Sequence, residues 1–190
     1  FSETKLETLI IPPSVEKLKG GFFIQNIIIS PDNHNLKWND NCFIVGKSKE
    51  NTDDFDVLIY SRRDIQQAFI GSNIKIIESY CFSGCSKLQN IIFESESKLT
   101  TIEKCAFSST AIQTIIIPQH VKNIGEYAFS SCQQLKTIEF HSNSEVQSIG
   151  RYAFSSSAIE NITIPQHVKN IEEYKFYSCK QLKTIEFHSN

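Results

Sequence analysis

Short hydrophobic runs recur along the chain with the same internal spacing. Each run follows the pattern [L/I]-x-x-I-x-[I/F], in which the first, fourth and sixth positions are apolar. Because side chains alternate between the two sides of a strand, the fourth and sixth positions point inward and the fifth points outward. The pattern therefore predicts a short β-strand with one buried side in every run. The runs begin at Leu6, Ile24, Ile65, Leu88, Ile112, Leu135, Ile159 and Leu182.

A phenylalanine precedes each of the last five runs, and an isoleucine lies five residues before each phenylalanine. A repeat of about 20 to 29 residues that carries L-x-x-L-x-L is typical of a leucine-rich repeat solenoid. One coil cannot bury its own strand, so neighbouring coils must stack. We predict about eight coils, the first three degenerate, with the phenylalanines in one column. These are Phe82, Phe107, Phe129, Phe154 and Phe176, separated alternately by 25 and 22 residues.

Two segments are repeated word for word, 47 residues apart. The segment IPQHVKNI begins at Ile117 and at Ile164, and QLKTIEFHSN begins at Gln134 and at Gln181. The chain thus starts and stops inside repeats, and we interpret residues 1–190 as one solenoid that is truncated at both ends. The predicted fold is mainly β. It has a parallel concave sheet on one side of the coils and short turns or short helices on the other.

The spacing between runs is larger in one place. Ile24 and Ile65 are 41 residues apart, whereas later runs are 23 or 24 apart. Two apolar stretches in this interval, 42–45 and 57–60, flank a polar and acidic loop, which predicts a β-hairpin insertion over residues 36–60. Such an insertion either contributes to a functional surface or is a tolerated surface excursion.

The segment IPQHVKNIGEYAFSSCQQLKTIEF resembles the BspA-like leucine-rich repeats, also called the Treponema pallidum type. The resemblance runs from Ile65 to Asn190 and, more weakly, from Phe1 to Ile29, and the hairpin resembles an insertion common in that family. Its members are typically surface or secreted proteins and surface antigens of bacteria and parasitic protists. The isoleucine- and asparagine-rich composition resembles family members of protists such as Trichomonas more than those of bacteria. The resemblance implies a cell-surface or secreted adhesion module, with a host or matrix protein such as fibronectin as its partner.

The fifth position of each run carries the candidate binding residues. In five consecutive runs it is a large apolar residue, although it should face solvent. At about 4.8 Å between strands, these side chains would form a strip on the order of 20 Å long. An exposed apolar strip predicts a binding surface; the β-strand preference of these residues, or a hairpin folded over them, would explain the same pattern. The outward strip consists of Ile10, Ile28, Phe69, Ile92 and Ile116, and Glu139 follows it.

Composition and charge argue against several other functions. The formal net charge is -2 and no basic cluster occurs, so nucleic acid is not an expected partner. The longest apolar runs hold three or four residues, far fewer than the roughly 20 that span a bilayer. The chain contains neither G-x-S-x-G nor a glycine-rich phosphate loop. We therefore expect no enzyme activity and no cofactor.

The six cysteines do not predict a disulfide framework. Cys85, Cys132 and Cys179 recur on alternate coils, so they should lie about 10 Å apart. A bridge needs Cα atoms within about 7 Å, and these positions therefore predict a buried ladder of small side chains. A bridge between Cys81 and Cys105, on adjacent coils, remains open.

The histidines and one sequon also have structural explanations. His120 and His167 are repeat equivalents, as are His141 and His188. Partners two coils apart cannot share a zinc ion, whose ligand atoms lie within about 2.1 Å of the metal. The sequon at Asn161 could accept a glycan in a secreted protein, but it falls on a predicted strand.

The sequence leaves two main functions open. The first is a non-enzymatic solenoid that binds proteins through the outward strip. The second is a structural spacer or stalk that displays another domain. An enzyme ranks third, because the repeat explains every candidate catalytic residue.

Overall fold

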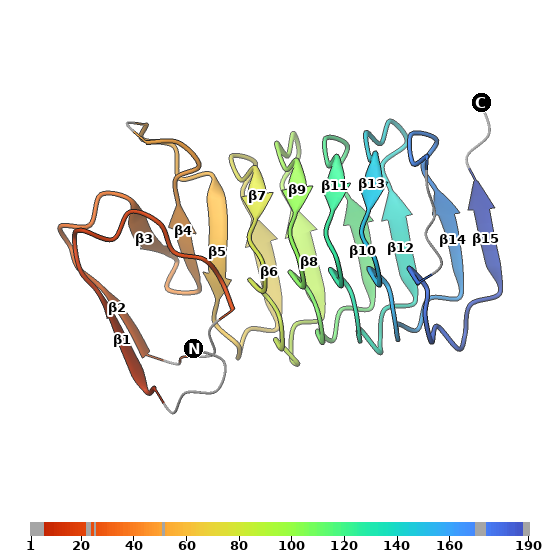
Figure 1. Ribbon diagram of the computed structural model, residues 1–190, viewed down its shortest axis with the longest axis horizontal. Helices are drawn as coiled ribbons and strands as arrows, with labels where there is room; N and C mark the ends of the chain where they lie inside the picture. Colours follow the sequence, from red (N-terminus) through yellow and green to blue (C-terminus); the bar gives the residue numbers. More distant parts are fainter. Residues whose placement is uncertain (1–5, 22–23, 25, 51, 170–173, 188–190) are drawn as a thin grey trace.

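The computed structural model describes residues 6–21, 24, 26–50, 52–169 and 174–187. In these residues the chain winds into a solenoid whose coils stack side by side along the long axis (Figure 1). All eight hydrophobic runs contain a four-residue strand. These strands are β1 (Thr8–Ile11), β2 (Asn26–Ile29), β6 (Gln67–Ile70), β8 (Asn90–Phe93), β10 (Thr114–Ile117), β12 (Thr137–Phe140), β14 (Asn161–Ile164) and β15 (Thr184–Phe187).

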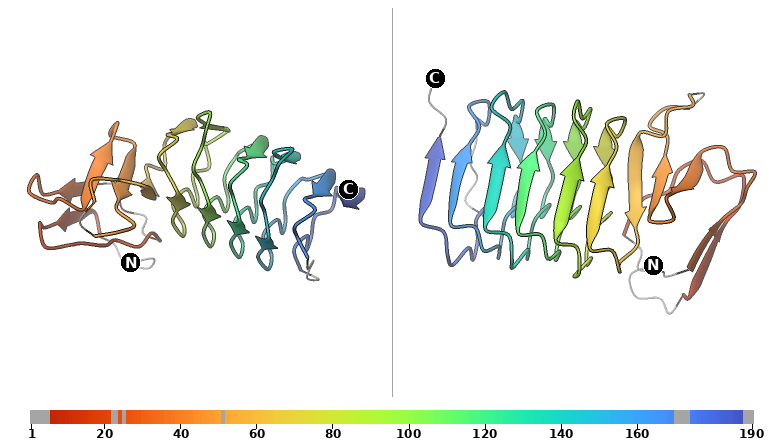
Figure 2. Two further views of the ribbon diagram at one scale, coloured as in Figure 1. Left: turned by 90° about the horizontal axis from the view of Figure 1, so that it is seen from above. Right: turned by 180° about the vertical axis from the view of Figure 1, so that it is seen from behind.

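Strands β6, β8, β10, β12, β14 and β15 lie along one side of the stack, which we call the long-strand face (Figure 2, right). The opposite side, the short-strand face, carries two-residue strands that join in one continuous parallel ladder. This continuity shows that the backs of the coils are held in strict register. The short strands are β7 (Ile76–Ile77), β9 (Thr101–Ile102), β11 (Asn123–Ile124) and β13 (Ser148–Ile149).

The predicted phenylalanine column is confirmed. Successive rings from Phe82 to Phe176 stack with centroids 5.0 to 5.8 Å apart and planes within 17°. The four rings from Phe82 to Phe154 are fully buried. The sequence did not indicate that Phe43, from the insertion, meets the edge of Phe82 at 6.0 Å and so extends the column. Burial of one such ring contributes about 3 kcal/mol, so the column is a large part of the apolar core that joins the coils.

The prediction of short helices was wrong. The described residues contain no helix, and each coil turns through consecutive β-turns. In four of the coils two positions adopt the left-handed conformation, as at Tyr127 (φ 56°) and Ser131 (φ 59°) on either side of Phe129. A left-handed residue interrupts right-handed helical geometry, so these turns cannot extend into a helix.

The count of eight stacked coils was also too high. About six coils stack, from β6 to β15, whereas β1 and β2 pair only with each other. They pack against the insertion and share a separate hydrophobic cluster with it. Tyr60 Oη donates to Ile24 O at 2.7 Å and Trp38 Nε1 donates to Ile27 O at 3.2 Å. The insertion therefore stands between the first two runs and the main stack.

The insertion contains three antiparallel strands, β3 (Leu36–Asn39), β4 (Phe43–Gly46) and β5 (Val57–Ser61). Strand β5 pairs in parallel with β7, so the insertion continues the short-strand ladder. Phe43, Val45 and Leu58 join the main core, while Ile44 and Ile59 join the second one. Because both sides of these strands are buried, the apolar residues run continuously instead of alternating. The insertion leaves the long-strand face uncovered.

Candidate protein-binding surface

The structure places every residue of the outward strip at the surface. Phe69 and Ile116 are 58% and 60% exposed, and Ile92 is 46% exposed. Ile10 and Ile28 are exposed as well, and they lie opposite each other on β1 and β2. Strand β2 makes no contact with β6, so the strip is not continuous as predicted. It is divided into the pair on β1 and β2 and the group of Phe69, Ile92 and Ile116 on the main stack.

The long-strand face is not one sheet. Its strands form three separate parallel pairs, β6 with β8, β10 with β12, and β14 with β15. In the first two pairs, the residue after the second strand closes the ladder: Glu94 N donates to Ile70 O at 3.0 Å and His141 N donates to Ile117 O at 3.2 Å. Between pairs, that position is Pro118 or Pro165. Because proline has no N–H, it cannot donate to the preceding strand, and the ladder is interrupted there.

The first groove lies at the gap between β8 and β10 and has a volume of about 720 Å³. The outward side chains of Ile92 and Ile116 line it from either side, with Phe93 and Pro118 at one end. Glu94 and Glu96 also line it, and Glu94 Oε2 accepts a hydrogen bond from Ser72 N at 2.8 Å. The predicted binding residues Ile92 and Ile116 thus belong to a defined concave feature.

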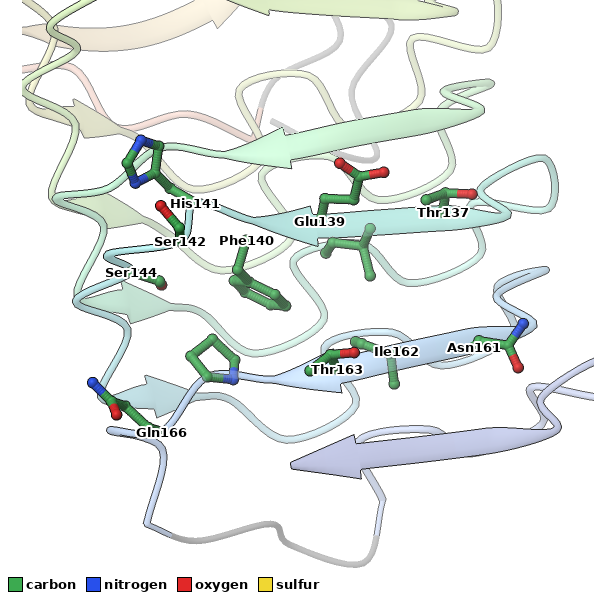
Figure 3. A pocket seen from close by; sticks show the side chains of 12 residues that line it. Thr137, Glu139, Phe140, His141, Ser142, Ser144, Asn161, Ile162, Thr163 and Gln166 are labelled. Carbon is green, nitrogen blue, oxygen red and sulfur yellow. The ribbon is translucent and has the colours of Figure 1, made fainter. Parts of the chain in front are cut away.

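The second groove lies at the equivalent gap between β12 and β14, with a volume of about 440 Å³. Figure 3 shows Phe140 pointing from β12 toward β14, while Glu139 and Thr163 occupy the outward positions. One long hydrogen bond, Glu160 N to Lys136 O at 3.5 Å, crosses this gap. The second groove is therefore smaller and more polar than the first.

The predicted cysteine ladder is present, and no disulfide forms. All six cysteines are free thiols, including Cys81 and Cys105. Cys132 Sγ donates to Phe107 O at 3.1 Å and lies 3.3 Å from Thr110 Oγ1, and Cys179 repeats both contacts two coils on. Burial raises the pKa of Cys132 to about 11. A buried, protonated thiol is a poor nucleophile, so Cys132 has a structural role.

The histidines that the structure describes do not gather into a metal-binding group. No cluster of three or more His, Cys, Asp or Glu side chains suited to a metal ion occurs in the described residues. His120 Nδ1 instead lies 2.9 Å from Glu145 Oε1 on the next coil, and His141 Nδ1 accepts from Asn143 N at 3.2 Å. His188 lies outside the described residues. The sequon residue Asn161 is exposed on β14, where Thr184 Oγ1 donates to its Oδ1 at 2.6 Å.

Residues 57–183 match six copies of the BspA type leucine rich repeat region. The chain belongs to the BspA type leucine rich repeat family. Families of this solenoid type are generally non-catalytic and of a protein-interaction or surface-antigen type. No curated protein matches the sequence. The described part of the chain has no helical segment with the length and hydrophobicity that a bilayer span requires.

Three solved structures share the fold. A leucine-rich repeat protein from Eubacterium ventriosum has a TM-score of 0.80 at 23% identity, over 95% of this chain and 48% of its own. The pneumococcal vaccine antigen PcpA has a TM-score of 0.63 at 26% identity, over 96% and 40%. The leucine rich repeat protein of T. pallidum has 0.63 at 22%, over 79% and 81%. The chain thus spans less than half the length of the first two proteins.

Proposed function

We propose that this BspA-type solenoid binds other proteins through the exposed apolar side chains of β6, β8 and β10. The observation that carries the proposal is the exposure of Phe69, Ile92 and Ile116 on strands that the stack already holds in place. A preformed apolar surface loses little conformational entropy on binding. Three large apolar side chains together on an otherwise polar face are typical of a partner-binding site.

The proposed setting is the surface of a cell or the secreted fraction, where the module takes part in adhesion to a host. The pneumococcal relative is a vaccine antigen, which supports exposure to a host for proteins of this kind. The proposed partner is a host-cell or matrix protein such as fibronectin. The isoleucine- and asparagine-rich sequence supports a parasitic protist such as Trichomonas as the source.

The test is binding of the 190-residue chain to immobilised fibronectin and to host cells. The double variant Ile92→Glu/Ile116→Glu should bind at least about tenfold more weakly, because buried apolar contacts become buried charges. Glu186→Gln, on β15 at the far end of the same face, is the matched control and should bind as the parent does. Unchanged binding by the double variant would show that the outward strip is not the binding surface. An inert parent chain would favour the spacer instead.

A further inference from the structure

The two grooves are repeats of each other, built 47 residues apart with several wall residues in common. Ile91 and Ile138 correspond, as do Phe93 with Phe140 and Pro118 with Pro165, and all six line their grooves. The serines that follow each strand also correspond: Ser97 Oγ accepts from Leu99 N, and Ser144 Oγ accepts from Val146 N, both at 3.4 Å. The residues that form the base of a groove thus occur twice in the sequence.

The residues at the mouths of the grooves differ. The first groove has Ile92 and Ile116 at the outward positions, where the second has Glu139 and Thr163. Glu94 and Glu96, which line the first groove, correspond in the repeat to His141, which lines both grooves, and to Asn143. The lining differs further at Asn90 and Thr114, which correspond to Thr137 and Asn161, but these four side chains are all polar. The exchanges at the outward positions and the rim therefore make the main difference in what each groove can bind. The two grooves can therefore be compared directly, to find how the outward and rim residues affect binding.

The first groove combines an apolar mouth with negative charge. Glu94 and Glu96 line it, together with His120 and His141, and neither lysine nor arginine does. His120 Nδ1 lies 2.9 Å from Glu145 Oε1, a third carboxylate beside the groove. The hydrogen bond from Ser72 N holds the Glu94 carboxylate in place at the end of β8. The volume of about 720 Å³ falls within the range of roughly 300 to 1,000 Å³ that is typical of ligand pockets. The strands beside it, β8 and β10, do not pair with each other, so their facing edges have main-chain groups available to a ligand.

We propose that the first groove binds an extended basic segment of a partner protein, in which a large aliphatic side chain is flanked by lysine or arginine. The aliphatic side chain sits between Ile92 and Ile116, and the flanking cations face Glu94 and Glu96. This deepens the proposed function and rests on it. Charge complementarity selects a basic segment over an acidic one, because like charges at the rim repel.

The probes are three labelled pentapeptides with alternating residues: lysine–isoleucine, glutamate–isoleucine and lysine–serine. The 190-residue chain should bind the lysine–isoleucine peptide at least about tenfold more tightly than either of the others, in fluorescence anisotropy at low ionic strength. Raising the salt concentration should weaken this binding, because exposed charges are screened. Calorimetric titration should give one site per chain.

Exchange of the mouths makes the test specific. Ile92→Glu/Ile116→Thr gives the first groove the outward residues of the second, and it should abolish binding of the lysine–isoleucine peptide. The reverse change converts the second groove and should raise the stoichiometry from one site to two. It consists of Glu139→Ile, Thr163→Ile and Asn143→Glu, and His141 is kept because it also lines the first groove. All of these positions are exposed, so each variant should fold as the parent does. Thermal unfolding followed by circular dichroism checks this.

The outcomes separate this inference from the proposed function. Equal binding of the glutamate–isoleucine peptide, or an unchanged stoichiometry in the converted variant, overturns the inference. Binding to fibronectin or host cells that depends on Ile92 and Ile116, without any binding of the lysine–isoleucine peptide, leaves the proposed function standing and this inference wrong. If Ile92→Glu/Ile116→Thr instead converts a dimer to a monomer in sedimentation equilibrium, the groove is a contact between two copies of the chain.

Discussion

The coils from β6 to β13 each contribute a long strand to one face and a short strand to the other, and the two faces are joined differently. On the short-strand face every coil bonds to the next, and the turns repeat the bond, as where Phe107 N donates to Ala128 O at 2.8 Å. On the long-strand face the strands at every second junction do not pair, and a single long hydrogen bond crosses the junction between β12 and β14. Stacking is therefore secured at the turns and the phenylalanine column. The long-strand face is free to open into grooves without loss of the solenoid.

The largest expected loss of stability comes from a substitution in the phenylalanine column. Phe129→Ala removes a fully buried ring that stacks on Phe107 and Phe154, and it should lower the free energy of unfolding by about 3 to 5 kcal/mol. Ile116→Ala on the opposite face should change it by no more than about 0.5 kcal/mol, since that side chain is mostly exposed. Urea unfolding of both variants measures the difference. Similar midpoints would mean that the column does not carry the stack.

A second prediction uses pH at the cysteine ladder. The pKa of Cys132 is about 11 in the folded chain, against an ordinary value of 9.0. As the pH rises above 9, the unfolded chain loses this proton before the folded chain does. The stabilisation that comes from the protonated thiol is therefore complete below pH 9 and is lost by pH 11. Over that window it should cost about 2 to 3 kcal/mol of stability.

The control for this prediction is Cys132→Ser, which has no thiol to titrate. Its hydroxyl can still donate to Phe107 O, and all other groups titrate as in the parent. The difference in free energy of unfolding between the parent and this variant should therefore change between pH 8 and pH 11. A constant difference would show that the thiol is not protected by burial.

A third, smaller effect compares a glycine on each face. A Cβ at Gly125 would lie 2.6 Å from Glu103 C and Lys104 N on the neighbouring coil. Gly125→Ala should thus force the short-strand faces of two coils apart and cost about 1 to 3 kcal/mol. At Gly71, after β6, the closest atom is Oδ1 of the flexible Asn73 side chain, so Gly71→Ala should change stability by at most about 0.5 kcal/mol. Chemical denaturation of the two variants gives the comparison, and the opposite order would contradict it.

The sequence predicts the features that repeat, because stacked coils need the same residue at the same place. The isoleucine and phenylalanine spacing located all eight strands and the column of rings. The turns were harder to predict, since serine, tyrosine and cysteine hold left-handed positions where glycine would have been the recognisable signal, as at Ser109 and Cys105. The insertion also concealed the break between the first two runs and the stack.

The outward strip was predicted from alternation alone, but the grooves were missed. Their signal is present in the sequence: Pro118 and Pro165 follow alternate strands, and the interval between runs alternates between 23 and 24 residues. Recognising that signal requires knowing that a missing N–H at this position leaves a gap between strands instead of a mere turn. That consequence depends on the neighbouring coil and cannot be predicted from one repeat.

Amide hydrogen exchange at two equivalent residues tests whether the hydrogen-bond ladder of the long-strand face is interrupted between β8 and β10. Lys136 N donates to Gln113 O at 2.9 Å within the β10–β12 pair, whereas Gln113 N faces the open junction with β8 and has no such bond in the described residues. By NMR, after correction for intrinsic rates, the Lys136 amide should exchange at least about tenfold more slowly than the Gln113 amide. Equal protection of the two amides would mean that β8 and β10 are joined and that the first groove does not exist.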